Sequence, residues 1–551
     1  MIAPRRGWMG RLLQDSTLYL IGNLAGRALG FLAIPFYARF LSPAEYGTIE
    51  LVELGTTTVA IAFGLQGIGA ALSRIYHDQA GSQADERSVV STGLIGTATL
   101  SAAVTGLFLL LAAPLGRAVL HSGAWTGLLQ AAFVGMFLGN LVEVALIYER
   151  IRERARFFLA YSLATLALNL ALNILFIGVL HLGVWGFVSS KLCITGLSCT
   201  YLLSRVVREV GWRWRSALVP QFVRFGAPLI VSSLAFFAIH FSDRFFLTGA
   251  VSLADLGRYA LAYRFAMLLS VVVGDSFHKS WGVSCYRHAG EAGWEAQFAR
   301  VARFLTFATV LVGLAIAVGA PAALRVMVPA SYEPPLLVLP LLVLGYVFRE
   351  IGDFFNYVLL VKRRSVRVGQ VAAGCAVLNA VLNIVLIPEY GITGAAMATL
   401  LTWVGYASIC WRVARREAAL PIQPGAYARI LLLGAGVFAA SRVLQVSSIP
   451  CQVLLDMGWI MLFAALCVPL YFTRAERGLI REGAAFIAGR VLTTSGALLA
   501  SALPMQGQRR LERLPRAQAW QREDEAARTR QPALARIQRV SPDTAPPSAA
   551  A

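Results

Sequence analysis

The chain has few side chains that bind metal ions or form cross-links. Its 551 residues include seven cysteines and six histidines, with no CxxC motif and no Cys/His cluster. Five of the cysteines lie in apolar runs: Cys193, Cys199, Cys375, Cys410 and Cys467. This distribution argues against a zinc-binding or disulfide framework, and we expect neither a metal site nor a cofactor.

Charged residues are also scarce, acidic ones most of all. Only 14% of the residues are charged, 57% are hydrophobic, and the mean hydropathy is +0.65. A soluble domain has about 25% charged and about 45–50% apolar residues, so this composition indicates a polytopic membrane protein. Lys and Arg number 49 against 29 Asp and Glu, a net charge of +20. In a membrane protein such an excess is typical of cytoplasmic loops, so we expect no nucleic acid partner.

Fourteen segments are long and apolar enough to be predicted as spans, since crossing a bilayer takes about 20 residues. They lie near residues 17–38, 47–72, 89–112, 125–148, 158–180, 184–204, 223–247, 257–280, 299–320, 334–361, 368–387, 392–411, 428–445 and 453–472. No loop between them is long enough to form a domain.

Basic residues are distributed unevenly between the two sets of loops. Before the C-terminal tail, the loops on the N-terminal side hold 23 Lys and Arg, whereas the opposite loops hold Arg39, Arg117, Arg325 and Arg442. This bias predicts an even number of spans with both termini in the cytoplasm. Residues 1–15 then form a retained cytoplasmic N-terminus, because no cleavage site of a signal peptide follows them.

Residues 473–551 form a basic tail that we expect to stay in the cytoplasm. The segment 483–503 is apolar, but its crossing would export an Arg-rich end, so we expect an interfacial helix there. Roughly the last 45 residues have a composition typical of disorder. Contact with anionic membrane lipids and the lack of a specific role both fit this composition.

The sequence contains an internal repeat. "LNLALNILFIGVLHLGVWG" (168–186) is written again as "LNAVLNIVLIPEYGITG" (378–394), 210 positions later. At the same offset, "SPAEYG" (42–47) matches "SLADLG" (252–257), "RIRERARF" from Arg150 matches "LVKRRSVR" from Leu360, and Glu143 matches Asp353. Four matches in one register indicate a duplication. The offset contains six predicted spans, an even number, so the two copies enter the membrane in the same direction.

The predicted fold is therefore an all-α integral membrane protein of 14 transmembrane helices: two parallel-repeat six-helix lobes plus two C-terminal helices. We place the N-lobe at 16–204, a cytoplasmic linker at 205–222, the C-lobe at 223–412 and the last two spans at 428–472. Duplicated halves of this kind form the rocking bundles of many transporters, which favours a transporter over a channel or a scaffold.

Several charged residues lie inside predicted spans, where each costs at least about 2.5–3.5 kcal/mol unless it faces protein or water. Arg27 belongs to a polar stripe that includes Asn23, and neither Arg27 nor Arg264 has a partner on its own helix turn. The candidates for a cationic cavity are Asn23, Arg27, Lys191, Arg244, Arg264 and Arg349. The candidates for a coupled ion are Glu50, Glu53, Glu143, His240, Asp243, Asp275 and Asp353.

Other polar residues in the spans are better explained by structure. Asp275 with Lys279, and Arg349 with Asp353, are spaced i,i+4 and can neutralise each other along one helix. The asparagine pairs at 169/173 and 379/383 are more typical of hydrogen bonds between helices than of substrate contact. A cationic cavity, in contrast, implies an anionic cargo, because arginine forks bind phosphate oxygens well.

The stretch 16–52 resembles the opening of the polysaccharide-biosynthesis flippases, in the multidrug/oligosaccharidyl-lipid/polysaccharide export superfamily (MATE-like). The residues that carry the pattern are Pro35, Arg39, Leu41, Ser42, Pro43, Glu45, Tyr46 and Gly47. With its topology and repeat, the resemblance covers about 16–472. It implies an inner-membrane flippase for a polyprenyl-diphosphate-linked oligosaccharide in O-antigen, capsule or exopolysaccharide synthesis. It also implies polysaccharide polymerase or assembly proteins as partners, and cavity-lining arginines in the first and eighth spans, where Arg27 and Arg264 lie.

Alternative functions stay open. A drug or cation antiporter of the same superfamily would use Glu50 and Glu53 as an acidic site, and a peptidoglycan-precursor flippase would move a different lipid-linked sugar. A glycosyltransferase or polymerase needs catalytic residues in a large outer loop, which the predicted topology lacks, so we do not expect an enzyme. A membrane scaffold would have no need for the buried charges.

Overall fold

The computed structural model describes residues 30–478, except for positions 32, 66, 79–82, 120–124, 363 and 475, and the regular elements in these residues are all helices. The chain divides into two compact units, residues 1–467 and 468–551. The architecture below is that of the first unit. The predicted N-terminus (1–15), the first part of span one and the predicted interfacial helix at 483–503 lie outside the described residues.

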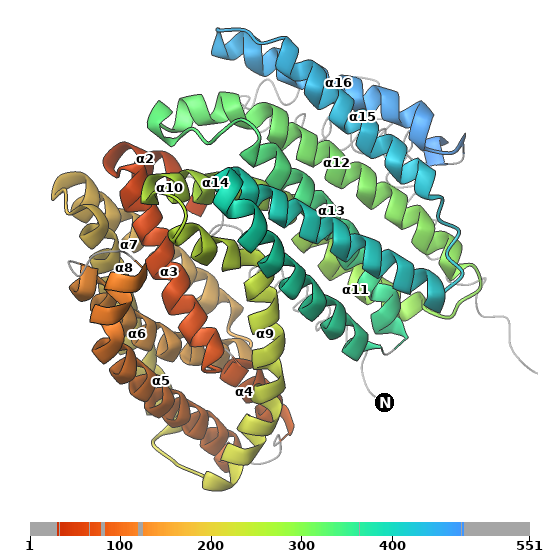
Figure 1. Cartoon of the computed structure of the whole chain (residues 1–551). Coiled ribbons are helices and arrows are strands. Elements are labelled where there is room, and N and C mark those ends of the chain that lie inside the picture. Colours follow the sequence, from red (N-terminus) through yellow and green to blue (C-terminus); the bar gives the residue numbers. More distant parts are fainter. Residues whose placement is uncertain are drawn as a thin grey trace, which may run out of the picture. The chain divides into compact units, whose positions relative to one another are not determined.

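The first lobe contains helices α2 to α8 (Figure 1). Their bounds are α2 Ile34–Phe40, α3 Pro43–Ala62, α4 Gly67–Asp78, α5 Gln83–Val119, α6 Thr126–Ile151, α7 Ala155–Asn173, the π-helix η2 Ile174–Val179 and α8 Gly183–Val210. Helix α3 begins after Ser42 because Ser42 and Glu45 form a capping box, in which each side chain bonds the other's backbone N–H. Helices α3 and α4 meet at a bend of 48°, near Gly64, whose φ is +73°.

The second lobe and the C-terminal helices follow. Their bounds are η3 Ser216–Leu218, α9 Val219–Thr248, α10 Leu253–Leu269, the π-helix η4 Ser270–Gly274, α11 Asp275–His288, α12 Trp294–Met327, η5 Ala330–Tyr332, α13 Val338–Val361, α14 Ser365–Glu417, α15 Pro424–Val443 and α16 Ile449–Tyr471. Helix α14 consists of two helical segments that meet at a kink at Gly391, which has φ 55° and ψ −132°. A positive φ at this position is accessible to glycine at little cost.

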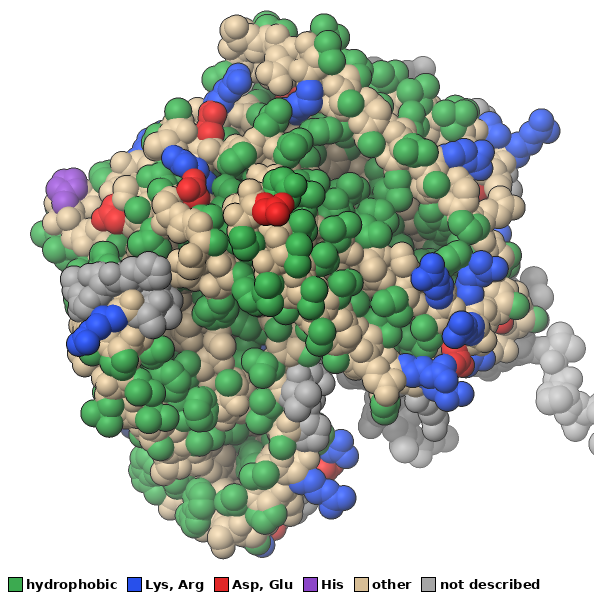
Figure 2. All heavy atoms as spheres, in the orientation of Figure 1, with side chains coloured by type: hydrophobic (Ala, Val, Ile, Leu, Met, Phe, Trp, Pro, Cys, Tyr) green, Lys and Arg blue, Asp and Glu red, His purple; other side chains and the backbone are tan. Residues whose placement is uncertain are grey.

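The side chains are distributed as expected for a protein in lipid. Large apolar residues face outward, as with Leu110 and Val443, each 81% exposed, whereas Arg244 and Glu350 are buried. Figure 2 shows one face that hydrophobic side chains largely cover, with Lys and Arg gathered in small groups near its edges. A soluble protein would show the opposite pattern, so the chain is a multi-pass membrane protein.

Among the described residues, nine helices are long and apolar enough to cross a membrane, or ten if α3 and α4 form one bent span. Helix α13 is not among the nine. Every stretch of 18 residues in it contains three charged residues, Arg349, Glu350 and Asp353, which is more than an apolar span of this kind holds. Helix α14 covers two predicted spans, 368–387 and 392–411. The all-helical membrane fold is confirmed, and the count of fourteen spans stays a prediction.

Equivalent positions of the repeat have equivalent local structures. Ser42 and Ser252 both accept a hydrogen bond from the backbone N–H three residues later, at 3.3 and 3.1 Å. Asn173 donates to the Asn169 side chain, and Asn383 donates to the Asn379 side chain. The two matching segments 42–47 and 252–257 also begin the helices α3 and α10, which pack against each other. The duplication thus brings its own two copies into contact.

Candidate functional site

Glu50 of α3 joins the two lobes through a pair of arginines. Its Oε1 lies 3.1 Å from Nε of Arg244 on α9, and its Oε2 lies 3.1 Å from Nη2 of Arg264 on α10. One carboxylate of the first lobe therefore bridges two guanidinium groups of the second. Each oxygen accepts a charge-assisted hydrogen bond, the stronger kind.

Arg244 is the buried member of this cluster, and hydrogen bonds and a ring contact hold its guanidinium group in place. It donates from Nη1 to Oδ1 of Asp243 at 3.0 Å and to the backbone carbonyl of His240 at 3.3 Å. Its guanidinium lies 4.2 Å from the centre of the Tyr263 ring, and the Tyr259 hydroxyl donates to Oδ2 of Asp243. Since two carboxylates balance two guanidinium groups here, the cluster is nearly neutral, as buried charges require.

Arg264 is the member of the cluster that reaches a cavity. Its side chain is 33% exposed, against 1% for Arg244, and its guanidinium lies 5.2 Å from the ring of Tyr46. The cavity has a volume of about 280 Å³ and is lined by Gly30, Ala33, Phe36, Tyr37, Tyr46, Ile49, Glu53, Leu166, Asn169, Leu170, Asn173, Phe187, Lys191 and Arg264. It thus combines a cation of the second lobe with polar residues of the first.

The second cation of this cavity is Lys191 on α8, whose Nζ lies 2.6 Å from Oε1 of Glu53. Both residues also line a neighbouring cavity of about 200 Å³ between α3, α6 and α8. Glu50 and Glu53 lie three residues apart on α3, so their side chains lie on neighbouring parts of one helix face. Each of the two cations of the cavity, Arg264 and Lys191, is therefore neutralised by a glutamate of α3.

A second charged cluster lies inside the C-lobe, around Glu350 of α13. This carboxylate accepts from the Ser270 hydroxyl and lies 2.9 Å from Nε2 of His278. Arg349 donates to Ser270 at 2.8 Å and lies 3.5 Å from Oδ2 of Asp353, so the predicted Arg349–Asp353 pair is confirmed. The Tyr406 hydroxyl donates to the other oxygen of Asp353 at 2.6 Å.

Five predicted residues are not among the side chains named above: Asn23, Arg27, Glu143, Asp275 and His240. Asn23 and Arg27 lie outside the described residues. Glu143 is half-exposed and pairs with Arg150 at 2.6 Å. Asp275 is the first residue of α11. His240 takes part through its backbone carbonyl, and its ring packs 5.1 Å from Trp403.

The two asparagine pairs have different surroundings. In the C-lobe, Asn379 accepts from Ser242 of α9 and donates to Thr402, both at 3.1 Å, which is the predicted bonding between helices. In the N-lobe, Asn169 and Asn173 line the cavity of Arg264. The same residues thus serve packing in one copy and face a cavity in the other.

Sequence reasoning missed several residues of these sites. Tyr46, Tyr259, Tyr263, His278 and Tyr406 were not among the candidates. Tyr46 was noted only as part of the opening motif. The i,i+4 spacing of Tyr46 and Glu50, and of Tyr259 and Tyr263, is a signal that could have placed these three tyrosines on charged helix faces. Within the residues that the structure describes, no group of three His, Cys, Asp or Glu side chains is arranged to hold a metal ion.

Comparison with solved structures identifies the fold. The solved structure "Lipid II flippase MurJ, inward closed conformation" matches with a TM-score of 0.65 at 13% identity, over 82% of this chain and 98% of that one. An inward-facing multidrug resistance MATE family transporter of the MOP superfamily matches with a TM-score of 0.58 at 16% identity, over 72% and 95%. The chain has the fold of these membrane transporters.

The family comparison is more specific. The family described as "Polysaccharide biosynthesis protein" matches residues 12–281, so the resemblance drawn from the opening motif is confirmed. Two curated relatives are "Lsg locus putative protein 1" of Haemophilus influenzae and "Succinoglycan biosynthesis transport protein ExoT" of Rhizobium meliloti. The first is 22% identical over 48% of this chain and 63% of its own length, and the second is 26% identical over 45% and 49%. The chain thus spans less than two thirds of the length of these relatives.

Proposed function

We propose that the chain moves a polyprenyl-diphosphate-linked oligosaccharide across the cytoplasmic membrane by alternating access of its two lobes. The observation that carries this proposal is Glu50, which holds Arg264 beside a cavity that both lobes line. The similarity to a family of polysaccharide biosynthesis proteins supports a saccharide cargo. The fold, shared with a lipid II flippase and a multidrug transporter, supports a carrier rather than an enzyme.

In this proposal the diphosphate is recognised by exchange of partners. Without cargo, Glu50 and Glu53 neutralise Arg264 and Lys191, which keeps the cost of placing cations in the membrane low. A diphosphate that enters the cavity competes with the glutamates, and an arginine fork binds its oxygens in a bidentate manner. Because Glu50 belongs to the other lobe, release of Arg264 loosens a contact between the lobes.

Other predicted residues have parts in the same proposal. Asn23 and Arg27, predicted for span one, are proposed as further polar and basic contacts of the cargo, and Arg244 keeps Glu50 in position. Arg349 belongs to the C-lobe cluster. His240, Asp243, Asp275, Asp353 and Glu143 are the other candidates for a coupled proton or cation. The basic loops and both termini lie in the cytoplasm, the polyprenyl chain stays in lipid, and polymerase or assembly proteins receive the product.

The membrane potential is sufficient to bias the direction of this transport. Moving about two negative charges outward across a membrane with an inside-negative potential of 100 mV releases roughly 4–5 kcal/mol. This is enough for a concentration ratio of more than a thousandfold, if no cation moves with the cargo.

A second function is favoured by one observation. Glu53 lines both neighbouring cavities and is one-third exposed, as an acidic site for a cationic drug requires. In that reading the chain is a drug or cation antiporter, and Lys191 is the group that its cargo displaces.

Deletion of the gene followed by mass spectrometry of polyprenyl-linked oligosaccharides tests the proposal. We expect one complete lipid-linked repeat unit to accumulate in the cell, and its mass identifies the cargo. Accumulation of the peptidoglycan precursor instead would assign the chain to that pathway. An unchanged lipid pool together with sensitivity to cationic dyes would favour the antiporter and refute the flippase.

A further inference from the structure

Another charged cavity lies at the Arg-rich end of the N-lobe, separate from the site between the lobes. Its volume is about 330 Å³, and its lining residues are Tyr76, Glu86, Arg87, Tyr148, Arg152, Arg154, Arg208 and Glu209. We propose that this cavity binds a phosphate group. The lining comes from α4, α5, α6, α8 and the turn between α6 and α7, so three distant stretches of the sequence, 76–87, 148–154 and 208–209, converge on it.

The two carboxylates of the cavity already have partners. Glu209 accepts from Nη2 of Arg154 at 2.7 Å and from the Tyr148 hydroxyl at 2.9 Å. Glu86 accepts from the Tyr76 hydroxyl at 2.8 Å. These contacts leave the carboxylates less free to neutralise the other cations around the cavity.

The positive charge that the two glutamates do not neutralise lies on three guanidinium groups. Arg87, Arg152 and Arg208 are exposed and line the cavity, and none of them forms an ion pair with another described residue, although Arg152 bonds the Tyr76 hydroxyl. With Arg154 and the two glutamates, the lining has a net charge of +2, which complements a phosphate of charge about −2. Arginine is the side chain best suited to bind phosphate oxygens in pairs.

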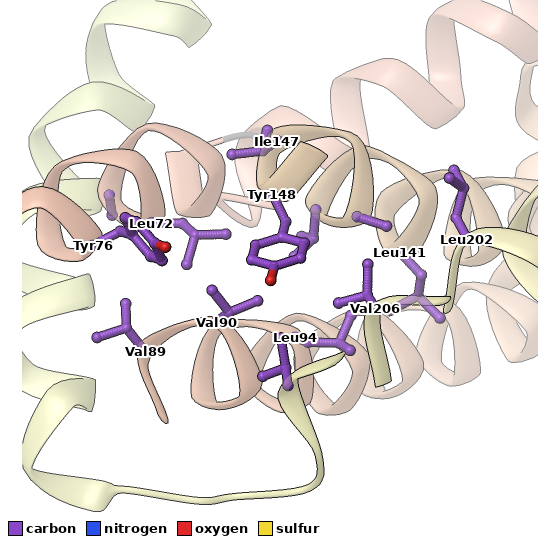
Figure 3. Close-up of a cluster of buried hydrophobic side chains, with 14 of the residues drawn as sticks. Leu72, Tyr76, Val89, Val90, Leu94, Leu141, Ile147, Tyr148, Leu202 and Val206 are labelled. Atoms are coloured by element: carbon purple, nitrogen blue, oxygen red, sulfur yellow. The ribbon is translucent and has the colours of Figure 1, made fainter. Parts of the chain in front are cut away.

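The cavity has a rigid wall. The rings of Tyr76 and Tyr148 belong to the hydrophobic core of the N-lobe, with Leu72, Val90 and Leu94 (Figure 3). Their hydroxyls leave this core to bond the two glutamates. The tyrosines therefore fix the acidic side chains, and a ligand that enters need not order the wall first.

Arg154 also pairs with a second carboxylate, which is buried. Its Nη1 lies 3.1 Å from Oε2 of Glu149, a carboxylate with no exposed surface that also accepts from Nε of Arg205 at 2.8 Å. The hydrogen bond with Glu209 raises the pKa of Arg154. The turn before Arg154 contains Glu153 at a φ of 54°, a conformation that residues other than glycine adopt only where the surrounding structure holds it.

The loops at this end are rich in basic residues in general, which is a simpler explanation of the basic lining of the cavity. The internal repeat tests this explanation. Lys362 and Arg364 occupy the positions of Arg152 and Arg154, 210 residues later. The loops "GVWG" and "GITG" then differ in spacing by two residues, so Arg416 and Glu417 correspond to Arg208 and Glu209. Arg364 again lies 3.8 Å from Glu417.

The C-lobe therefore keeps the basic loop, its ion pair and, as Tyr286, the equivalent of Tyr76, but it lacks the other residues that build the cavity of the N-lobe. Val358, Leu359 and Gln297 stand at the positions of Tyr148, Glu149 and Arg87. The bias of basic residues accounts for what the two lobes share. It does not account for Tyr148, the buried Glu149 and Arg87, which have no equivalent in the C-lobe.

Two sources supply a phosphate at this place: the headgroup of an anionic lipid and a soluble molecule. The test uses the full-length protein and two probes. Pyrophosphate is titrated against the detergent-solubilised protein, with the melting temperature as the signal. Retention of phosphatidylglycerol against phosphatidylcholine is measured by native mass spectrometry after release from nanodiscs.

The variant Arg152→Gln/Arg208→Gln removes two exposed charges of the cavity, and Lys362→Gln/Arg416→Gln removes their exposed equivalents in the C-lobe. We expect the first variant to weaken binding by about tenfold or more, because it removes two groups that donate charge-assisted hydrogen bonds to phosphate oxygens. The second variant should bind as the parent does. Selective loss of the pyrophosphate signal identifies a soluble ligand, and selective loss of phosphatidylglycerol identifies a lipid. Equal losses in both variants, or no binding of either probe to the parent, refute the site. The result is independent of which cargo the protein moves.

Discussion

Gly47 and Gly257, the last residues of the two repeated motifs, lie against each other where the two lobes meet. A Cβ atom on Gly47 would lie 3.1 Å from the backbone nitrogen of Gly257, and a Cβ atom on Gly257 would lie 3.1 Å from that of Gly47. Each Cβ would also overlap a backbone carbonyl of the facing helix, at Leu253 and Pro43. Only a pair of glycines permits this approach of α3 and α10.

The variant Gly47→Ala should therefore separate the lobes at this crossing. A methyl group against backbone has no side chain to displace, so the helices must shift at a cost of about 1–3 kcal/mol. We expect a lower melting temperature and a loss of transport. Gly55→Ala is the matched control on the same helix, because no atom lies within 4 Å of its Cβ. It should be neutral or slightly stabilising, since alanine favours a helix. Equal behaviour of the two variants would show that the crossing is not tight.

The two arginines bound to Glu50 should respond differently to substitution. Arg264→Ala leaves Glu50 paired with Arg244, so we expect a folded protein that does not export the glycan, while Arg264→Lys keeps part of the activity. Arg244→Ala leaves Glu50 and Asp243 short of a buried cation and should destabilise the fold by about 3–5 kcal/mol. Glycan export and the amount of folded protein are measured side by side.

Arg412→Ala serves as the control for these variants, since Arg412 is exposed and lies outside the cavity. We predict the same export defect for Arg27→Ala as for Arg264→Ala. Normal export by both, at normal expression, would show that neither arginine binds the cargo.

The sequence predicts the single charges of this site, but not how they are paired. Arg264 stands out because it lies in an apolar segment with no partner on its own helix turn. Its partner, Glu50, is 214 residues away in the other lobe. Helical periodicity shows which residues share a face, but not which helix lies opposite. Hence the Arg349–Asp353 pair, within one helix, could be predicted, and the bridge between Glu50, Arg244 and Arg264 could not.

The same limit explains the C-lobe cluster. His278 and Glu350 lie 72 residues apart, and the π-helix η4 brings α11 to its place beside α13. A one-residue change of helix register of this kind is not visible in the apolar pattern. The repeat was predictable because it depends on matching residues at a fixed offset. The close approach of Gly47 and Gly257, at equivalent positions of the repeat, was not, because it depends on which helices pack together.

Glu53→Gln distinguishes the two proposed functions. The change removes the carboxylate that neutralises Lys191 and leaves a free cation in the cavity. A carrier of a diphosphate should keep its export or gain affinity, because the cargo no longer competes with Glu53. An antiporter of cations should lose its transport. Glycan export and efflux of a cationic dye are compared in the same strain, with the exposed Glu291→Gln as the control.

Glu350→Gln tests whether the C-lobe cluster serves the fold. The carboxylate is buried and is the common partner of Ser270 and His278, with Arg349 at 3.5 Å. Since a neutral amide leaves this cation with one fewer carboxylate, we expect a loss of stability of about 3–5 kcal/mol. Thermal unfolding in detergent measures it, with the exposed Glu291→Gln as the control.

A second variant reaches the same carboxylate from the other side. A Cβ atom on Gly274 would lie 2.8 Å from the carboxyl carbon of Glu350, so Gly274→Ala pushes Glu350 away from Ser270 and His278 without removing its charge. If the hydrogen bonds of Glu350 hold α11 against α13, both variants should lower the melting temperature. A drop with Glu350→Gln alone would mean that the charge matters and the position does not. Unchanged melting in both would show that the cluster contributes nothing to stability, and would leave transport as the reason for a buried carboxylate at this position.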